Sequence, residues 1–71
     1  MTTANKNYAT FTDNKKFEDA NIVNFYSYEG RFIKTWWNNE LVRKMFVYKS
    51  EEGLLKAVQK MEKDSNYTRV K

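Results

Sequence analysis

Hydrophobic and polar positions divide the chain into three apolar runs and one amphipathic segment. The runs cover residues 22–28, 31–37 and 41–48 and are rich in Val, Ile, Leu, Phe, Tyr and Trp. Short polar breaks at residues 29–30 and 38–40 separate them. Runs of β-branched and aromatic residues between turn residues are typical of strands. The pattern therefore predicts a three-stranded antiparallel meander.

The segment that follows has a helical period. Its apolar positions, three to four residues apart, are Leu54, Leu55, Val58 and Met61. Ser50 is a suitable N-cap, and the acidic residues after it favour the first turn of a helix. A helix of three to four turns is marginal alone, so its apolar stripe must dock on the sheet. We expect an α+β fold of order β-β-β-α, with the helix packed on one sheet face.

Both ends of the chain are polar and offer little to offset the entropy of ordering. Residues 1–16 are interpreted as a flexible or weakly ordered N-terminal segment, although weak alternation over residues 8–12 leaves a short edge strand open. Residues 17–66 form the single domain, in which residues 17–20 are compatible with one helical turn. Residues 67–71 are interpreted as a C-terminal tail.

A two-residue turn at Glu29-Gly30 sets the register of the first hairpin, because Gly supplies the positive φ that tight turns need. It pairs Tyr28 with Arg31, and the pairing continues to Ile22 and Trp37. Side chains alternate across a strand, so the hairpin has one largely apolar face and one mixed face. A slip of one residue would exchange them. The facing of residues 41–48 stays open, because both of their alternating sets are apolar.

The apolar hairpin face and the helix stripe are the expected core. Its predicted members are Val23, Phe25, Phe32, Trp36, Phe46, Leu54, Leu55, Val58 and Met61. If the Trp36 ring is buried, Trp36→Ala should be among the costliest substitutions, at roughly 3–5 kcal/mol.

The amino-acid composition excludes most common types of catalytic site. The 71 residues include no Cys and no His, which excludes Ser-His and Cys-His catalysis and the usual zinc ligands. With two Gly there is no glycine-rich phosphate loop, and the carboxylates are scattered among cations. We therefore expect a protein that is not an enzyme and holds no cofactor or metal.

The net charge and the lack of targeting signals limit the classes of partner that we expect. A net charge of +4 favours an anionic partner over a cationic one. The first residues lack the apolar core of a signal peptide, and no apolar run approaches the ~20 residues that span a bilayer. We expect a cytoplasmic protein with no membrane contact.

The mixed hairpin face is the candidate binding site. The predicted site residues are Tyr26, Tyr28, Arg31, Lys34, Trp37, Arg43 and Lys44. Bases stack on aromatic rings and cations meet phosphates, so the first hypothesis is nucleic-acid binding. The competing structural interpretation is that Tyr26, Ile33 and Trp37 only pack across strands or under the N-terminal segment.

The order of the expected elements and two short segments resemble those of known DNA-binding domains. Glu29-Gly30-Arg31 before an aromatic strand, and Phe-Val-Tyr-Lys-Ser-Glu-Glu at residues 46–52 before a helix, resemble plant AP2-type DNA-binding domains. The same features are similar to the arm-binding domains of phage and transposon integrases. The resemblance covers about residues 22–62 and implies a three-stranded sheet that reads the major groove of DNA. The positions that match the Arg/Trp pattern of those families are Arg31, Lys34, Trp36, Trp37, Arg43 and Lys44. Gly53 departs from it, because a helix former is expected there.

Two further hypotheses belong to other classes. Small size and an Asn-, Lys- and Tyr-rich composition also look like the phage proteins that inhibit or regulate a host enzyme or defence system, as anti-CRISPR proteins do. Tyr, Trp and Arg are common hot-spot residues of protein interfaces. The third hypothesis is a structural subunit that oligomerises through a strand edge. The exposed sheet face distinguishes the nucleic-acid hypothesis from the protein hypothesis. A continuous basic rim there favours nucleic acid, and an apolar patch with few cations favours protein.

Overall fold

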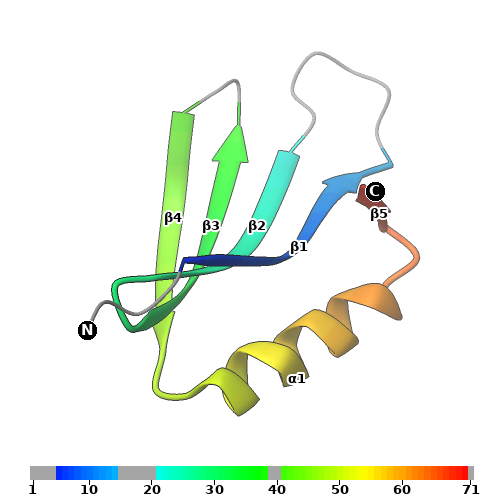
Figure 1. Cartoon of the computed structure of the whole chain (residues 1–71). Coiled ribbons are helices and arrows are strands. Elements are labelled where there is room, and N and C mark those ends of the chain that lie inside the picture. The colour runs from blue at the N-terminus through cyan, green and yellow to red at the C-terminus, as the bar shows by residue number, and fades with distance from the viewer. Residues whose placement is uncertain (1–4, 15–20, 39–40, 71) are drawn as a thin grey trace.

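The computed structural model describes residues 5–14, 21–38 and 41–70, and it shows a small α+β fold. Along the chain the elements are β1 (Lys6–Asp13), β2 (Asn21–Tyr28), β3 (Arg31–Asn38), β4 (Leu41–Tyr48), α1 (Glu51–Glu62) and β5 (Tyr67–Val70). The strands form one antiparallel sheet in the order β4-β3-β2-β1-β5. The helix lies along one side of this sheet (Figure 1).

The β2–β3 hairpin has the predicted register. Tyr28 pairs with Arg31 and Ile22 with Trp37, without a shift between them. Glu29 and Gly30 have φ angles of 50° and 80°, as a type I′ turn requires. This turn matches the right-handed twist of the strands, so it fixes which side chains face the helix.

The prediction of three strands was wrong, because the sheet has five. β1 lies between β2 and β5, and Phe11 pairs with Val23 on one side and Arg69 on the other. Thus residues 6–13, which we interpreted as a tail with an edge strand as the alternative, form an inner strand. Residues 67–70, interpreted as a tail, form the edge strand β5. The expected helical turn at residues 17–20 and part of the turn at residues 38–40 lie outside the described residues.

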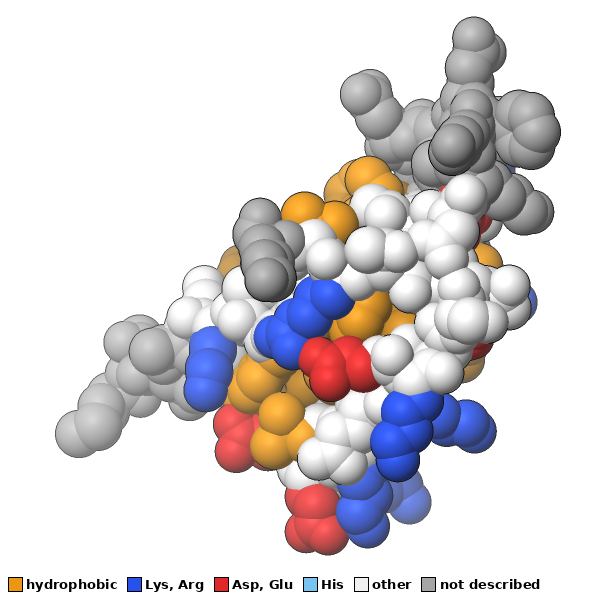
Figure 2. All heavy atoms as spheres, turned by 90° about the vertical axis from the view of Figure 1, so that its right-hand side faces the viewer, with side chains coloured by type: hydrophobic (Ala, Val, Ile, Leu, Met, Phe, Trp, Pro, Cys, Tyr) orange, Lys and Arg blue, Asp and Glu red, His pale blue; other side chains and the backbone are white. Residues whose placement is uncertain are grey.

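The helix begins as the sequence predicts. The Ser50 hydroxyl accepts a hydrogen bond from the Gly53 N–H at 3.3 Å. Glu52 and Lys56, one turn apart, form an ion pair of 3.3 Å that is well exposed and therefore contributes little stability. Figure 2, turned to view the molecule from its β5 side, shows charged side chains of both signs gathered over the lower part, where Figure 1 places α1. The outer surface of α1 is thus solvated.

The core lies between α1 and the strands β1 and β2. Its buried hydrophobic members are Ala9, Phe11, Val23, Phe25, Leu54 and Val58. The rings of Phe11 and Phe25 meet edge to face with centroids 5.9 Å apart. Phe32, Trp36 and Met61, all predicted core residues, are only partly buried against this cluster.

Two predicted core residues are exposed. Phe46 lies on the edge strand β4 and keeps 47% of its surface accessible, and Leu55 on α1 keeps 40%. Both predictions were wrong because the buried cluster lies between α1 and the strands β1 and β2, and neither Phe46 nor Leu55 belongs to it. Trp36 is not fully buried either, so the condition that made its loss one of the costliest is not met.

Gly53 offers a stabilising substitution. A Cβ at this position would meet Ser50 Oγ at 3.7 Å and Tyr48 Cβ at 3.9 Å, which is ordinary contact. Ala is favoured over Gly within a helix by roughly 0.5–1 kcal/mol. We expect Gly53→Ala to raise the free energy of unfolding by about that amount in urea titrations followed by circular dichroism. A lower free energy would mean that the cap cannot tolerate the methyl group.

A tyrosine joins β1 to the start of α1. The Tyr8 hydroxyl donates a hydrogen bond to the Glu51 carboxylate. This bond raises the pKa of Tyr8 above its ordinary value of 10.0. Burial raises the pKa values of Tyr48 and Tyr67 as well. Each raised pKa contributes stability that is complete below about pH 10 and is lost as the pH rises through the folded-state value.

Alkaline stability should therefore depend on Tyr8. Partial burial lowers the pKa of Lys34, so that residue acts in the opposite sense as the pH approaches 10.5. We expect the urea midpoint of the parent chain to fall above about pH 10, and that of Tyr8→Phe to fall less steeply. Comparing the two chains at each pH cancels the contribution of Lys34. Parallel pH profiles would show that the bond to Glu51 does not titrate with folding.

Candidate binding face

The sheet surface turned away from α1 is called the open face. Its members in the three strands β2, β3 and β4 are Ile22, Asn24, Tyr26, Tyr28, Arg31, Ile33, Thr35, Trp37, Val42, Met45 and Val47. They form cross-strand rows, of which Ile22–Trp37–Val42 and Tyr26–Ile33–Val47 are the most apolar. The register also settles the facing of β4: Met45 and Val47 lie on the open face, and Lys44, Phe46 and Tyr48 on the helix side.

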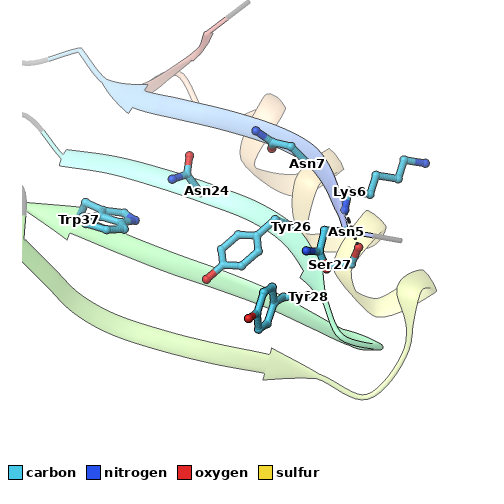
Figure 3. A pocket seen from close by; sticks show the side chains of 8 residues that line it. All are labelled: Asn5, Lys6, Asn7, Asn24, Tyr26, Ser27, Tyr28 and Trp37. Carbon is cyan, nitrogen blue, oxygen red and sulfur yellow. Dashed lines mark hydrogen bonds between the residues drawn. The ribbon is translucent and has the colours of Figure 1, made fainter. Parts of the chain in front are cut away.

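Part of the open face is hollowed to about 440 Å³. The hollow is lined by Asn5, Lys6, Asn7, Asn24, Tyr26, Ser27, Tyr28 and Trp37. Figure 3 shows Tyr26 and Tyr28 extending from β2 and Trp37 from the neighbouring strand, whereas the Lys6 side chain points away from these rings. The Lys6 ammonium instead lies 4.8 Å from the centroid of the Tyr8 ring. The hollow is thus lined mainly by aromatic rings and amides, because the Ser27 side chain is buried and its hydroxyl accepts the Lys6 N–H.

Buried neighbours support the Trp37 ring. Its indole N–H donates a hydrogen bond of 2.9 Å to the Thr35 hydroxyl. Thr35 is 1% exposed and Ile33 is 7% exposed, although both lie on the open face. A ring fixed by a buried hydroxyl loses little conformational freedom when it binds. The Trp37 ring is therefore held in one orientation on the open face.

The predicted site residues are divided between two sides of the sheet. Tyr26, Tyr28, Arg31 and Trp37 lie on the open face. Lys34 and Lys44 lie on the helix side, where Lys34 Nζ is 5.2 Å from the Phe46 ring centroid and Lys44 Nζ is 5.9 Å from that of Trp36. Arg43 is the extra residue where the β3–β4 register shifts. The rings of the predicted site come together, but its lysines do not join them.

Lys34 and Lys44 are close enough to influence each other. Partial burial lowers the pKa of Lys34, and the neighbouring charge of Lys44 lowers it further. Within the described part of the chain, neither lysine has a carboxylate oxygen within 4 Å. The helix-side surface of β3 and β4 thus carries positive charge without a local counter-ion from those residues.

Sequence reasoning missed the contribution of residues 5–7. Asn5 accepts a hydrogen bond of 3.2 Å from the Glu29 N–H, and the Lys6 N–H donates one of 3.0 Å to the Ser27 hydroxyl. These bonds fasten the start of β1 beside the hairpin turn, and they bring Asn5 and Asn7 to the rim of the hollow. Their polar composition gave no signal of this position, because the pairing partners are about 20 residues away.

Some kinds of site are not found among the described residues. The strand positions of the open face carry no carboxylate, and no three acidic residues in the described ranges gather as metal ligands. No helix in those ranges is both long and apolar enough to cross a bilayer.

No protein-family model, curated protein or solved structure matches the chain, so the resemblance to AP2-type and arm-binding domains stays a prediction.

Proposed function

We propose that this chain is a non-enzymatic protein-binding module whose open face contacts the partner. The observation that carries the proposal is the lining of the hollow, which combines Tyr, Trp and Asn side chains. Tyr and Trp supply rigid contact area at low entropic cost, and Asn supplies adaptable hydrogen bonds. The same combination is characteristic of the surfaces with which antibodies bind proteins.

The surroundings of the hollow support a protein partner. Val42, Met45 and Val47 continue the open face across β4 and are 44%, 59% and 58% exposed. Arg31 is the single cation among the open-face positions of β2 and β3. An apolar patch with few cations favours a protein partner, whereas nucleic acid would favour a continuous basic rim. Occupying a partner's surface in this way would suit an inhibitor or regulator of an enzyme or defence system.

Single-stranded nucleic acid is the second candidate. The rings of Tyr26, Tyr28 and Trp37 line one hollow, and the open-face positions of β2, β3 and β4 carry no carboxylate. Exposed rings of this kind can stack with unpaired bases. A DNA duplex is less suited, because its base faces are covered and its affinity depends on many phosphate contacts.

Site-specific photo-crosslinking in the cells that produce the chain tests the proposal. The crosslinking amino acid replaces Tyr28 on the open face or, as the control, Leu55 on α1, which is similarly exposed at 40% against 48%. We expect a discrete adduct from position 28 that protease removes and nuclease leaves intact, and none of that size from position 55. A nuclease-sensitive adduct from position 28 would establish the second candidate instead, and equal adducts from both positions would contradict a site on the open face.

A further inference from the structure

The outer edge of β4 is a second surface without a partner strand. Among the described strands, β3 lies on one side of β4 and none lies on the other. Edge strands are usually short, covered, or blunted by charges or bulges, because their free N–H and C=O groups can pair with another chain. In β4 the register shift lies near Arg43, and the pairing from Lys44 to Tyr48 is regular. The regular half is therefore available for pairing.

Alternation identifies the outward backbone groups. Tyr28 and Arg31 flank a two-residue turn and so form a hydrogen-bonded pair. Counting along β3, the groups of Phe32, Lys34 and Trp36 then point to β4, where their partners are Tyr48, Phe46 and Lys44. The N–H and C=O groups of Met45 and Val47 point away from the sheet.

The side chains next to this edge differ between the two faces. On the open face, Met45 and Val47 are apolar and 59% and 58% exposed. On the helix side, Lys44 flanks the half-exposed Phe46, and the Lys34 ammonium lies over that ring. A strand that pairs here would meet apolar groups on one face and cations on the other.

The positive charge of β4 indicates which kind of strand can pair with its outer edge. β4 carries Arg43 and Lys44 and no carboxylate. Antiparallel pairing of two copies centred on Lys44 would place that residue opposite itself. If the pairing of the two copies is centred on Phe46, Arg43 of one copy lies opposite Lys49 of the other. If it is centred on Met45, the Lys44 residues of the two copies are only about 7 Å apart along the strand direction. Each arrangement brings like charges together, whereas carboxylates in the added strand would neutralise them.

We propose that β4 accepts an extended acidic segment of a partner protein as a sixth strand, with alternating carboxylate and apolar side chains. The backbone of the segment pairs with Met45 and Val47, as in other cases of strand addition. Its carboxylates face Lys34 and Lys44 on the helix side, and its apolar residues extend the strip of Met45 and Val47. This inference rests on the proposed protein-binding function and names the chemistry of the partner.

Fluorescein-labelled peptides of alternating Glu and Val test this proposal by anisotropy, against the same peptide with Lys in place of Glu. We expect the acidic peptide to bind the full chain at least about tenfold more tightly, with a preference that weakens as salt rises. Lys44→Glu should reduce its affinity about tenfold. Lys63→Glu, which makes the same change of charge at the C-terminal end of α1, should change it by less than about twofold.

Val47→Pro tests the backbone pairing. It removes an outward N–H, and proline is tolerated on strand edges where the N–H faces solvent. We expect a folded variant that no longer binds the acidic peptide. If the variant unfolds, the comparison of Lys44→Glu with Lys63→Glu tests the proposal instead.

Three results would overturn the edge proposal: equal binding of the Glu and Lys peptides, equal effects of Lys44→Glu and Lys63→Glu, or sedimentation of the chain as a dimer that excludes the peptide. The last result would assign the edge to a second copy. Peptide binding without an adduct from position 28 contradicts only the open-face function, and an adduct without peptide binding contradicts only the edge proposal.

Discussion

Phe25→Ala is expected to remove a large share of the free energy of unfolding. The Phe25 side chain has no accessible surface, meets the Phe11 ring edge to face, and packs in the cluster that contains Leu54 and Val58. Removing a buried Phe ring costs about 3–5 kcal/mol. A domain of this length has a total stability of roughly 4–10 kcal/mol. Urea titration followed by circular dichroism should therefore show a much lower midpoint or no folded baseline.

Phe46→Ala is the matched control. It makes the same chemical change on the edge strand β4, where the side chain is 47% exposed. Because little surface is removed from the core, we expect a loss of less than about 1 kcal/mol. Similar losses for both variants would mean that β4 is packed as tightly as β2, contrary to the burial that the structure shows.

Trp37→Ala should have the largest effect on binding. The ring lines the hollow, and its N–H is fixed by the buried Thr35 hydroxyl. Truncating an interface hot spot costs 2 kcal/mol or more, which is at least about thirtyfold in affinity. We expect that loss for the protein captured by the crosslinker at position 28, and a matching fall in adduct yield.

Trp36→Ala is the neighbouring control for binding. Its ring lies on the helix side, where it meets Tyr67 edge to face with centroids 6.5 Å apart. We expect it to lower stability while the affinity of the folded protein for the partner changes little. Equal losses of affinity for Trp36→Ala and Trp37→Ala, both measured on folded protein, would show that contact is not confined to the open face.

The local features of the fold could be predicted from the sequence. Glu29-Gly30 specified a two-residue turn, and once the turn was placed, alternation fixed the pairing of β2 with β3 and the two faces of that hairpin. Ser50 and the acidic residues after it marked the start of α1. Each of these features depends on residues close together along the chain.

The non-local features could not be predicted. β1 buries Ala9 and Phe11, and also Asp13, so its hydrophobic alternation is weak. β5 has four residues and one half-buried side chain, and its partner β1 lies more than 50 residues away. Since β1 shares with β2 the cluster that is buried against the helix, the exposure of Phe46 on β4 depends on an element whose own hydrophobic pattern was weak.

The aromatic residues of the candidate site could be predicted from the sequence, but its polar and charged residues could be predicted less well. Tyr26, Tyr28 and Trp37 follow from strand alternation, so they reached the same face. Asn5 and Asn7 line the hollow only because β1 joins the sheet. Lys34 and Lys44 were included in the predicted site for their charge, yet the register places both on the helix side, where they bear on the edge of β4 instead.

The most direct test of a protein partner, as opposed to nucleic acid, uses the purified chain alone. Fluorescence anisotropy would measure its binding to a labelled mixed-sequence DNA single strand and duplex, at low and near-physiological salt. The account predicts weak binding at low salt, lost at higher salt and reduced equally by Arg31→Ala on the open face and Lys44→Ala on the helix side. Single-strand binding that persists at near-physiological salt, and that Arg31→Ala and Trp37→Ala abolish while Lys44→Ala does not, would contradict it.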